Sequence, residues 1–245
     1  MKKKTFYTEA AYFIGLPLLA FGTALTAYGG FGMSMVVAPA YILHLFLSQF
    51  FDFFSFGVAE YVFQAFILII LMLVLRKAKL SFLLSFISTI FYGLSLDAST
   101  LLTNLLPQQN IALQITAYII GIIICCASIA LLFVTYLPLE AYEMFVKELS
   151  AKFKRPIHGV KFLYDCASLV VAIILCIVLL NPFNGNGILD VLNNFMACGI
   201  GIGTVVCTFI FGYIIRLFQN IYLKLFKFKD KFKFRKYFEE SEETQ

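Results

Sequence analysis

Two stretches of nine residues share one pattern, SFISTIFYG at 85–93 and TVVCTFIFG at 204–212. When they are aligned, small polar residues or glycine stand at the same four places in both, and every other place holds a large apolar residue. The four pairs are Ser85 and Thr204, Ser88 and Cys207, Thr89 and Thr208, and Gly93 and Gly212. This agreement suggests the hypothesis that the chain contains a duplicated unit.

The composition of the chain is that of an integral membrane protein. Of 245 residues, 61% are hydrophobic and 13% are charged, whereas soluble domains are about 45–50% apolar and about 25% charged. The apolar runs are long and separate, while a transmembrane barrel shows short alternating segments. The sequence therefore predicts an all-α polytopic membrane fold.

Six apolar runs are long enough to cross a bilayer, which takes about 20 helical residues. They cover residues 12–28, 57–75, 81–101, 112–135, 161–181 and 196–218. Two further segments, 31–51 and 138–153, look helical but do not span well. The first is broken by Pro39, and the second begins with Pro138, which suits a first helical turn, and then follows an amphipathic spacing. We therefore expect six transmembrane helices plus two short interfacial or re-entrant helices.

Of the tails and loops that flank the predicted spans, only alternate ones contain Lys or Arg. They lie at the N-terminus, after the second and fourth spans and in the C-terminal tail, and none lies in the other three loops. Because short cytoplasmic loops are enriched in these residues, both termini are predicted in the cytoplasm of a bacterial cell, with the spans in its plasma membrane. The chain then divides into a tail at 1–11, one membrane domain at 12–218 and a basic-aromatic, then acidic, tail at 219–245.

The paired stretches fall in the third and sixth predicted spans, which run in opposite directions. Ala-Tyr pairs at 40–41 and 141–142 and Gly-Val pairs at 57–58 and 159–160 agree in order. We interpret 12–101 and 112–218 as inverted-topology repeats, an organisation that places solute sites near the bilayer midplane in several secondary transporters. The alternative is that generic apolar helices resemble each other.

The second half also carries a family resemblance. The segments LPLEAYEMFVKEL, GVKFLYD and GIGIGTVVCTFIFGYIIRLF follow one another there, and GFGMSMVVAP and Gly93 to Asp97 match more loosely in the first half. This order resembles the bacterial YczE/YyaS/YitT-like multi-pass membrane proteins. The matching residues are Lys161, Asp165, Gly201, Gly203, Thr204 and Gly212. The resemblance implies an uncharacterised membrane protein and supplies no catalytic residue and no substrate.

Lys161 and Asp165 are four residues apart at the start of the fifth predicted span, so they share a helix face and can pair. A charge inside the bilayer is expected to pair or to face a cavity. The pair is read either as an interfacial anchor or as a gate.

Glu60 and Gln64 lie on one face of the second predicted span, and His44 lies in the short helix before it. An intramembrane carboxylate is a functional candidate, so these three residues are candidate substrate-binding residues in an external vestibule. The alternative is that Glu60 occupies a solvated helix end.

Gly199, Gly201 and Gly203 alternate before Thr204. No strand precedes them and no Lys follows, so they do not form a nucleotide-binding loop. They are expected to permit close helix packing or a functional break in the helix, and Gly201, Gly203 and Thr204 are further substrate-binding candidates.

The sequence contains no arrangement that points to enzymatic or metal chemistry. The six cysteines lie in or near apolar runs without a C-x-x-C spacing and are read as small apolar fillers. We therefore expect no enzyme activity, cofactor or metal.

The C-terminal tail alternates basic and aromatic residues directly after the last span. We expect it to bind anionic lipid of the inner leaflet rather than nucleic acid. The basic residues assigned to this contact are Lys227, Lys229, Lys231, Lys233 and Arg235.

The leading functional hypothesis is the binding or transport of a small solute. The alternative is a non-transporting accessory or scaffold subunit that packs against a partner protein, a second copy or lipid. A small-residue face such as Ala20 and Ala24, if exposed, would favour the alternative.

Overall fold

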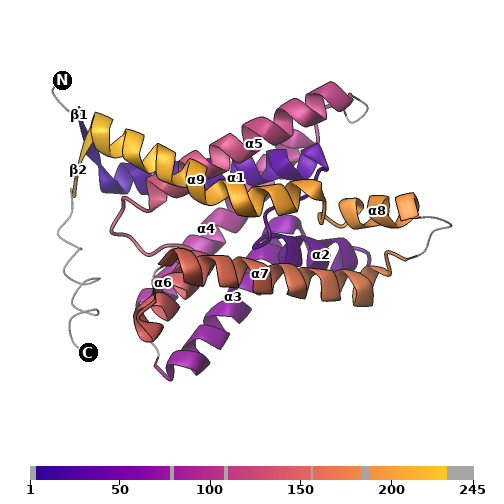
Figure 1. Ribbon diagram of the computed structural model, residues 1–245, viewed down its shortest axis with the longest axis horizontal. Helices are drawn as coiled ribbons and strands as arrows, with labels where there is room; N and C mark the ends of the chain where they lie inside the picture. The colour runs from indigo at the N-terminus through magenta and orange to yellow at the C-terminus, as the bar shows by residue number, and fades with distance from the viewer. Residues whose placement is uncertain (1–3, 78–79, 108–109, 156, 184–187, 231–245) are drawn as a thin grey trace.

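The computed structural model describes residues 4–77, 80–107, 110–155, 157–183 and 188–230. Nearly all of this chain is helical (Figure 1). The helices are α1 (Thr8–Gly29), α2 (Ala38–Leu47), α3 (Phe56–Leu75), α4 (Leu80–Thr103), α5 (Ile111–Leu132), α6 (Ala141–Phe153), α7 (Ile157–Leu175), which continues as the π-helical turn η1 (Cys176–Leu180), α8 (Ile188–Ala197) and α9 (Ile202–Leu225). Two four-residue strands, β1 (Lys4–Tyr7) and β2 (Phe226–Lys229), flank them.

The predicted all-α polytopic fold is confirmed. Six helices in the described part of the chain are long and apolar enough to cross a membrane. Five of them, α1, α3, α4, α5 and α7 with η1, begin and end within about four residues of the predicted spans because each is one uninterrupted apolar run. Helix α1 begins at Thr8 rather than at residue 12, so the tail before it is shorter than predicted.

The sixth predicted span, 196–218, is wrong in its bounds. The structure has a separate short helix, α8, then a non-helical stretch, and α9 begins only at Ile202 and ends at Leu225. The break arises because Gly199 adopts a left-handed φ of 82°, which favours glycine, and Gly201 is extended. Three short helices therefore accompany the spans, instead of the two expected.

The two expected short helices are present with narrower bounds. Helix α2 covers only part of 31–51 and has Pro39 in its first turn. Helix α6 begins at Ala141, so Pro138 precedes the helix instead of opening it. Tyr142 and Val146 on its apolar face are buried, as the amphipathic spacing predicts.

Helices α1 and α5 cross at the centre of the bundle (Figure 1). A Cβ atom at Gly22 would lie 2.9 Å from the backbone nitrogen of Cys125 and 3.0 Å from the carbonyl oxygen of Gly121, so glycine permits this crossing. Helix α4 packs on α1 and on α3, α9 packs on α5, α2 packs on α3 and α7, and α6 packs on α3, α4 and α7.

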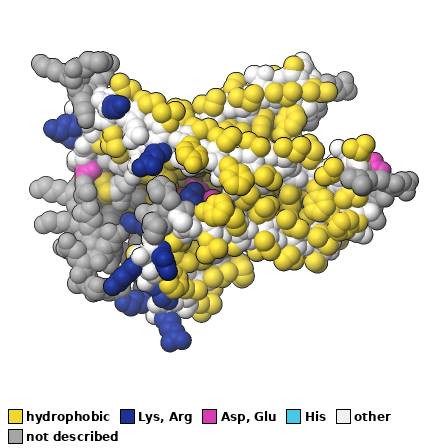
Figure 2. All heavy atoms as spheres, in the orientation of Figure 1, with side chains coloured by type: hydrophobic (Ala, Val, Ile, Leu, Met, Phe, Trp, Pro, Cys, Tyr) yellow, Lys and Arg dark blue, Asp and Glu magenta, His cyan; other side chains and the backbone are white. Residues whose placement is uncertain are grey.

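The first and last described segments meet at one end of the bundle. Strands β1 and β2 pair in parallel, with Lys4 opposite Phe226 and Tyr7 opposite Lys229. Because the first and last described segments lie at the same end of the bundle, the arrangement fits an even number of membrane spans. Figure 2 shows that Lys and Arg side chains gather at the same end. The cytoplasmic location of that end stays a prediction.

Large apolar side chains cover much of the bundle's outer surface (Figure 2). On α7 and α9, for example, Leu163 is 70% exposed and Phe209 is 62% exposed. Contiguous apolar surface of this kind is unfavourable in water and is suited to contact with lipid.

Candidate functional site

A cavity of about 460 Å³ lies between α1, α5 and α9 on one side and α6 and α7 on the other. It forms because α7 and α9 make little contact with each other, whereas α3 and α4 pack closely. Figure 2 shows charged side chains in the hollow between α9 and α7. The volume lies within the range of about 300–1,000 Å³ that is typical of small-molecule sites.

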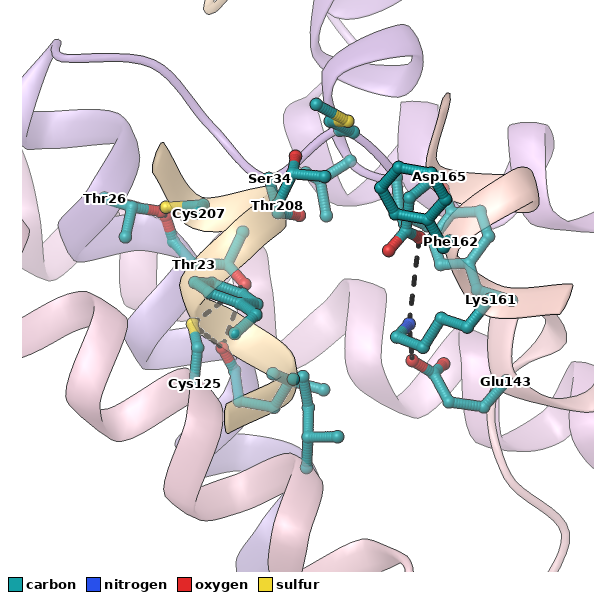
Figure 3. A pocket seen from close by; sticks show the side chains of 18 of the residues that line it. Thr23, Thr26, Ser34, Cys125, Glu143, Lys161, Phe162, Asp165, Cys207 and Thr208 are labelled. Carbon is teal, nitrogen blue, oxygen red and sulfur yellow. Dashed lines mark hydrogen bonds and ion pairs between the residues drawn. The ribbon is translucent and has the colours of Figure 1, made fainter. Parts of the chain in front are cut away.

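One wall of the cavity is ionic. Lys161 Nζ lies 3.8 Å from Asp165 Oδ1 on the same helix and 3.8 Å from Glu143 Oε1 on α6 (Figure 3). The predicted pairing of Lys161 with Asp165 is therefore present, and both residues line the cavity. All three side chains are mostly buried. Sequence reasoning missed Glu143, because α6 was read as a surface helix whose charges face solvent.

The opposite wall is neutral but polar. Thr23 and Thr26 on α1, Cys125 on α5, and Cys207 and Thr208 on α9 face the cavity (Figure 3). Their hydroxyl groups are bonded within the protein: Thr23 Oγ1 donates to Leu19 O at 3.0 Å, and Thr208 Oγ1 donates to Thr204 O at 3.0 Å. The cavity therefore presents ionic groups on the side of α6 and α7. The side of α1, α5 and α9 presents neutral oxygen and sulfur atoms together with the cation of Arg216.

Two further charged residues line the cavity, and neither was singled out from the sequence. Glu140 immediately precedes α6 and is buried. Burial raises the pKa of Glu140 well above its usual range, and the nearby carboxylates of Glu143 and Glu60 raise it further. Arg216 lies on α9, and no carboxylate in the described part of the chain forms an ion pair with it. The signal for Arg216 was available, since an arginine inside an apolar span is itself a functional pointer.

Behind the ionic wall lies a buried polar cluster. Glu60 Oε2 accepts hydrogen bonds from Tyr142 Oη at 2.9 Å and from Gln64 Nε2 at 3.2 Å. Gln64 Oε1 in turn accepts from Thr89 Oγ1 at 2.8 Å and from the Ala141 backbone nitrogen at 3.2 Å. Glu60 and Gln64 are both fully buried, so a solvated helix end is the wrong description of Glu60.

The remaining candidates from the first half separate from one another. His44 does not join Glu60 and Gln64: its Nδ1 lies 2.8 Å from Phe54 O and its ring stacks on Phe56. None of these three candidates is among the residues that line the cavity. Tyr142, which donates to Glu60 and lines the cavity, connects the polar cluster to it.

The glycine-rich start of α9 packs against the chain between α1 and α2. Gly203 N donates to Phe31 O at 2.9 Å, and a Cβ atom at Gly201 would lie 2.3 Å from the same oxygen. Thr204 Oγ1 accepts from Gly201 N at 3.1 Å and is itself fully buried. These glycines thus allow two non-helical stretches to cross, and the substrate contact predicted for Gly201, Gly203 and Thr204 stays a prediction.

The lipid-binding candidates are partly described. Lys227 and Lys229 are exposed on β2. Phe226 and Phe228, which alternate with these lysines, lie against Phe6 of β1. Lys231, Lys233 and Arg235 lie outside the described residues. In the described ranges, no group of three or more His, Cys, Asp or Glu side chains is arranged to hold a metal ion.

Comparison with known proteins identifies one family. Residues 6–220, which include every described helix except the last turn of α9, match DUF6198, a family of unknown function. The chain belongs to this family. The six long apolar helices are consistent with the expected multi-pass helical membrane family, while the relation to YczE/YyaS/YitT-like proteins stays a prediction. No curated protein and no solved structure matches the chain, so DUF6198 membership brings no substrate and no catalytic residue with it.

Proposed function

We propose that the protein binds a small charged solute in the cavity and moves it across the bacterial plasma membrane. The observation that carries this proposal is a cavity among membrane-spanning helices with charged groups on one wall. Charged residues are costly within a bilayer, where insertion scales give about 2.5–3.5 kcal/mol each. Their concentration around a cavity is the arrangement expected of a solute pathway.

The two walls indicate the kind of solute. A charged group of the solute can replace Glu143 or Asp165 as a partner of Lys161. The side-chain oxygen atoms of Thr23 and Thr208 can then contact the neutral polar part of the solute. Cys125 and Cys207 add apolar, polarisable surface. A compact solute with one charged end and one neutral polar end suits this cavity best.

The inverted repeat that we propose for this chain would support transport over simple binding. Helix α4 packs on α1 as α9 packs on α5, and α2 contacts α3 as α6 contacts α7. These neighbour relations agree with two related halves around the α1–α5 crossing. In such transporters the solute site lies between the repeats. Both proposed halves line this cavity: α1, residues 32–37 and Tyr92 come from the first, and α5, α6, α7 and α9 come from the second.

The test is a ligand-induced thermal shift on the purified protein, using separate panels of amino acids, amines, carboxylates and nucleosides. A solute present at about 100 times its Kd stabilises the folded state by about 2.7 kcal/mol. We expect one panel to raise the Tm of the wild type and of Lys152→Met, whose exposed lysine lies outside the cavity. The shift should be lost in Lys161→Met. An equal shift in both variants would refute binding at the ionic wall.

The competing proposal is an accessory or scaffold subunit. Ala20 and Ala24 are buried in the contact between α1 and α5, so that small-residue face cannot receive a partner. The surface that favours a partner is the outer side of α7 and α9, where Tyr213 is 81% exposed and Leu163 is 70% exposed. A second copy or another subunit seated there would give a stable higher-mass complex in mild detergent, and Leu163→Glu would dissociate it.

We also propose that the tail binds anionic lipid. Each basic residue near an anionic leaflet contributes about 1 kcal/mol, and the alternating aromatic rings favour the interface. A peptide of residues 221–238 should bind vesicles that contain anionic lipid, and salt should weaken the binding. Equal binding to neutral vesicles would contradict the electrostatic part.

A further inference from the structure

Glu60 is a carboxyl group in a membrane-spanning helix with no cation to neutralise it. It is fully buried, and its two hydrogen-bond donors, Tyr142 and Gln64, are both neutral. No Lys or Arg among the described residues forms an ion pair with it; the nearby cation Lys161 is engaged by Glu143 and Asp165. An unpaired carboxylate in such surroundings is strongly unfavourable, so the neutral acid is the favoured form.

The two oxygen atoms of Glu60 have different surroundings. Oε2 accepts both hydrogen bonds, whereas Oε1 is buried without a hydrogen-bond partner in the described part of the chain. If the carboxyl group were ionised, Oε1 would carry part of the negative charge and would have no hydrogen-bond donor. A protonated group places its hydrogen on Oε1 and leaves Oε2 as the carbonyl oxygen that accepts from Tyr142 and Gln64. The hydrogen-bond pattern therefore matches the neutral acid.

A metal ion does not fit the same position. Gln64 Oε1 is already engaged by Thr89 Oγ1 and by the Ala141 backbone nitrogen, and in the described ranges no group of three or more His, Cys, Asp or Glu side chains is arranged to hold a metal ion. Hard cations take several oxygen ligands. A proton needs only one oxygen atom.

The acids around Glu60 oppose its ionisation. Glu140 before α6 and Glu143 on α6 interact with it electrostatically, and each disfavours a further negative charge close by. Three phenols, Tyr92 on α4, Tyr142 on α6 and Tyr164 on α7, also interact with it, and of these Tyr142 donates a hydrogen bond to Oε2. His44 on the neighbouring α2 is engaged with Phe54 O.

We propose that Glu60 is a proton-binding site of this protein and that Tyr142 links its occupancy to the cavity. Tyr142 is the one side chain that both donates to Glu60 and lines the cavity in the described structure. When Tyr142 leaves Glu60, water from the cavity reaches the carboxyl group, which transfers its proton to that water and becomes a carboxylate. The O–H bond on Oε1 breaks, one O–H bond forms on the water, and no other bond changes. The coupling to a solute rests on the proposed function, whereas the proton site does not.

Infrared spectroscopy of the full-length protein in lipid bilayers tests the proton site without any solute. A protonated carboxyl group has a carbonyl stretch that a carboxylate lacks. At neutral pH we expect this band in the wild type, a loss of part of it in Glu60→Gln, and loss of the rest when Glu140→Gln is added. Glu143→Gln is the matched control and should leave the band unchanged, because Glu143 forms an ion pair with Lys161.

Two further measurements keep the result decisive. Tyr142→Phe removes the hydrogen bond to Oε2, so the Glu60 component should move to higher frequency. If Glu60→Gln does not fold, Glu140→Gln decides, because the band that remains in this variant belongs to Glu60 and must fade as pH is raised. The absence of a protonated-carboxyl band at neutral pH, or a band untouched by Glu60→Gln, overturns the proposal. A band that is present while no solute binds would refute the proposed function and leave the proton site standing.

Discussion

Gly57 and Gly93 bring α3 and α4 into backbone contact. A Cβ atom at Gly57 would lie 2.1 Å from Gly93 O, and one at Gly93 would lie 2.8 Å from Gly57 O. The same contact lets the carboxylate of Asp97 accept from Gly57 N at 2.7 Å and from Ser55 Oγ at 2.7 Å, so α4 caps the N-terminus of α3. On α9, by contrast, nothing lies within 4 Å of a Cβ atom at Gly212.

Alanine substitution should separate these two kinds of glycine. Gly57→Ala forces the α3–α4 contact apart and should destabilise the protein by about 1–3 kcal/mol, as overpacking does. Gly212→Ala meets no atom and should stabilise α9 by up to about 1 kcal/mol, because glycine is the poorer helix former. Thermal unfolding in detergent measures both. Equal effects of the two substitutions would contradict the difference in packing.

The stability of the protein should depend on the ionisation of Glu140. Its pKa is raised in the folded state, compared with about 4.3 for an unperturbed Glu. The folded state therefore holds the proton more tightly, and this contribution is complete below about pH 4.3 and is lost as pH rises through the folded pKa. The Tm of the wild type should fall over that interval relative to Glu140→Gln. A constant difference between the two proteins at all pH values would speak against a neutral Glu140.

Removal of the Lys161 ammonium should be costly. Lys161→Met leaves Glu143 and Asp165 mostly buried without their shared cation, which should cost about 1–3 kcal/mol. For a chain of this size that is a fall of several degrees in Tm. Adding Asp165→Asn should recover part of the loss, because it removes one of the two uncompensated charges. If the double variant is no more stable than Lys161→Met, the three groups do not act together.

Thiol labelling tests the predicted sidedness. In a cysteine-free background, single cysteines at Asn104 and Leu189, both exposed, should react with an impermeant reagent from outside intact cells. A cysteine at Lys152, at the opposite, basic end of the bundle, should react only after the membrane is opened. Labelling of Lys152→Cys in intact cells would reverse or disprove the six-span topology.

The spans could be predicted from the sequence because each is a continuous apolar run. The prediction of the sixth span failed because the apolar run continues through Cys198 to Gly201, whereas the helix does not. The left-handed Gly199 lies between the end of one helix and the beginning of the next. Hydropathy averages over such a break. Only the alternating glycines hinted at it, and they were also compatible with simple close packing.

The candidate site was predictable only in part. Lys161 and Asp165 could be paired because helix geometry fixes residues four apart. The burial of Glu60 could not be predicted, because it depends on α6 folding over α3 and placing Tyr142 on the carboxyl group. For the same reason Glu140 and Glu143 were not recognised as candidate residues.

The pairing of β1 with β2 has a mechanical consequence for α9. One end of this helix is fixed by the strand ladder to the start of the chain, and the other by the bond from Gly203 N to Phe31 O. A helix that is held at both ends bends near its middle and does not rotate as a rigid body. Gly212, without a side chain and without a neighbour at that point, lies near mid-length of α9. The cavity should therefore widen and narrow by flexure of α9 rather than by a swing of the whole helix.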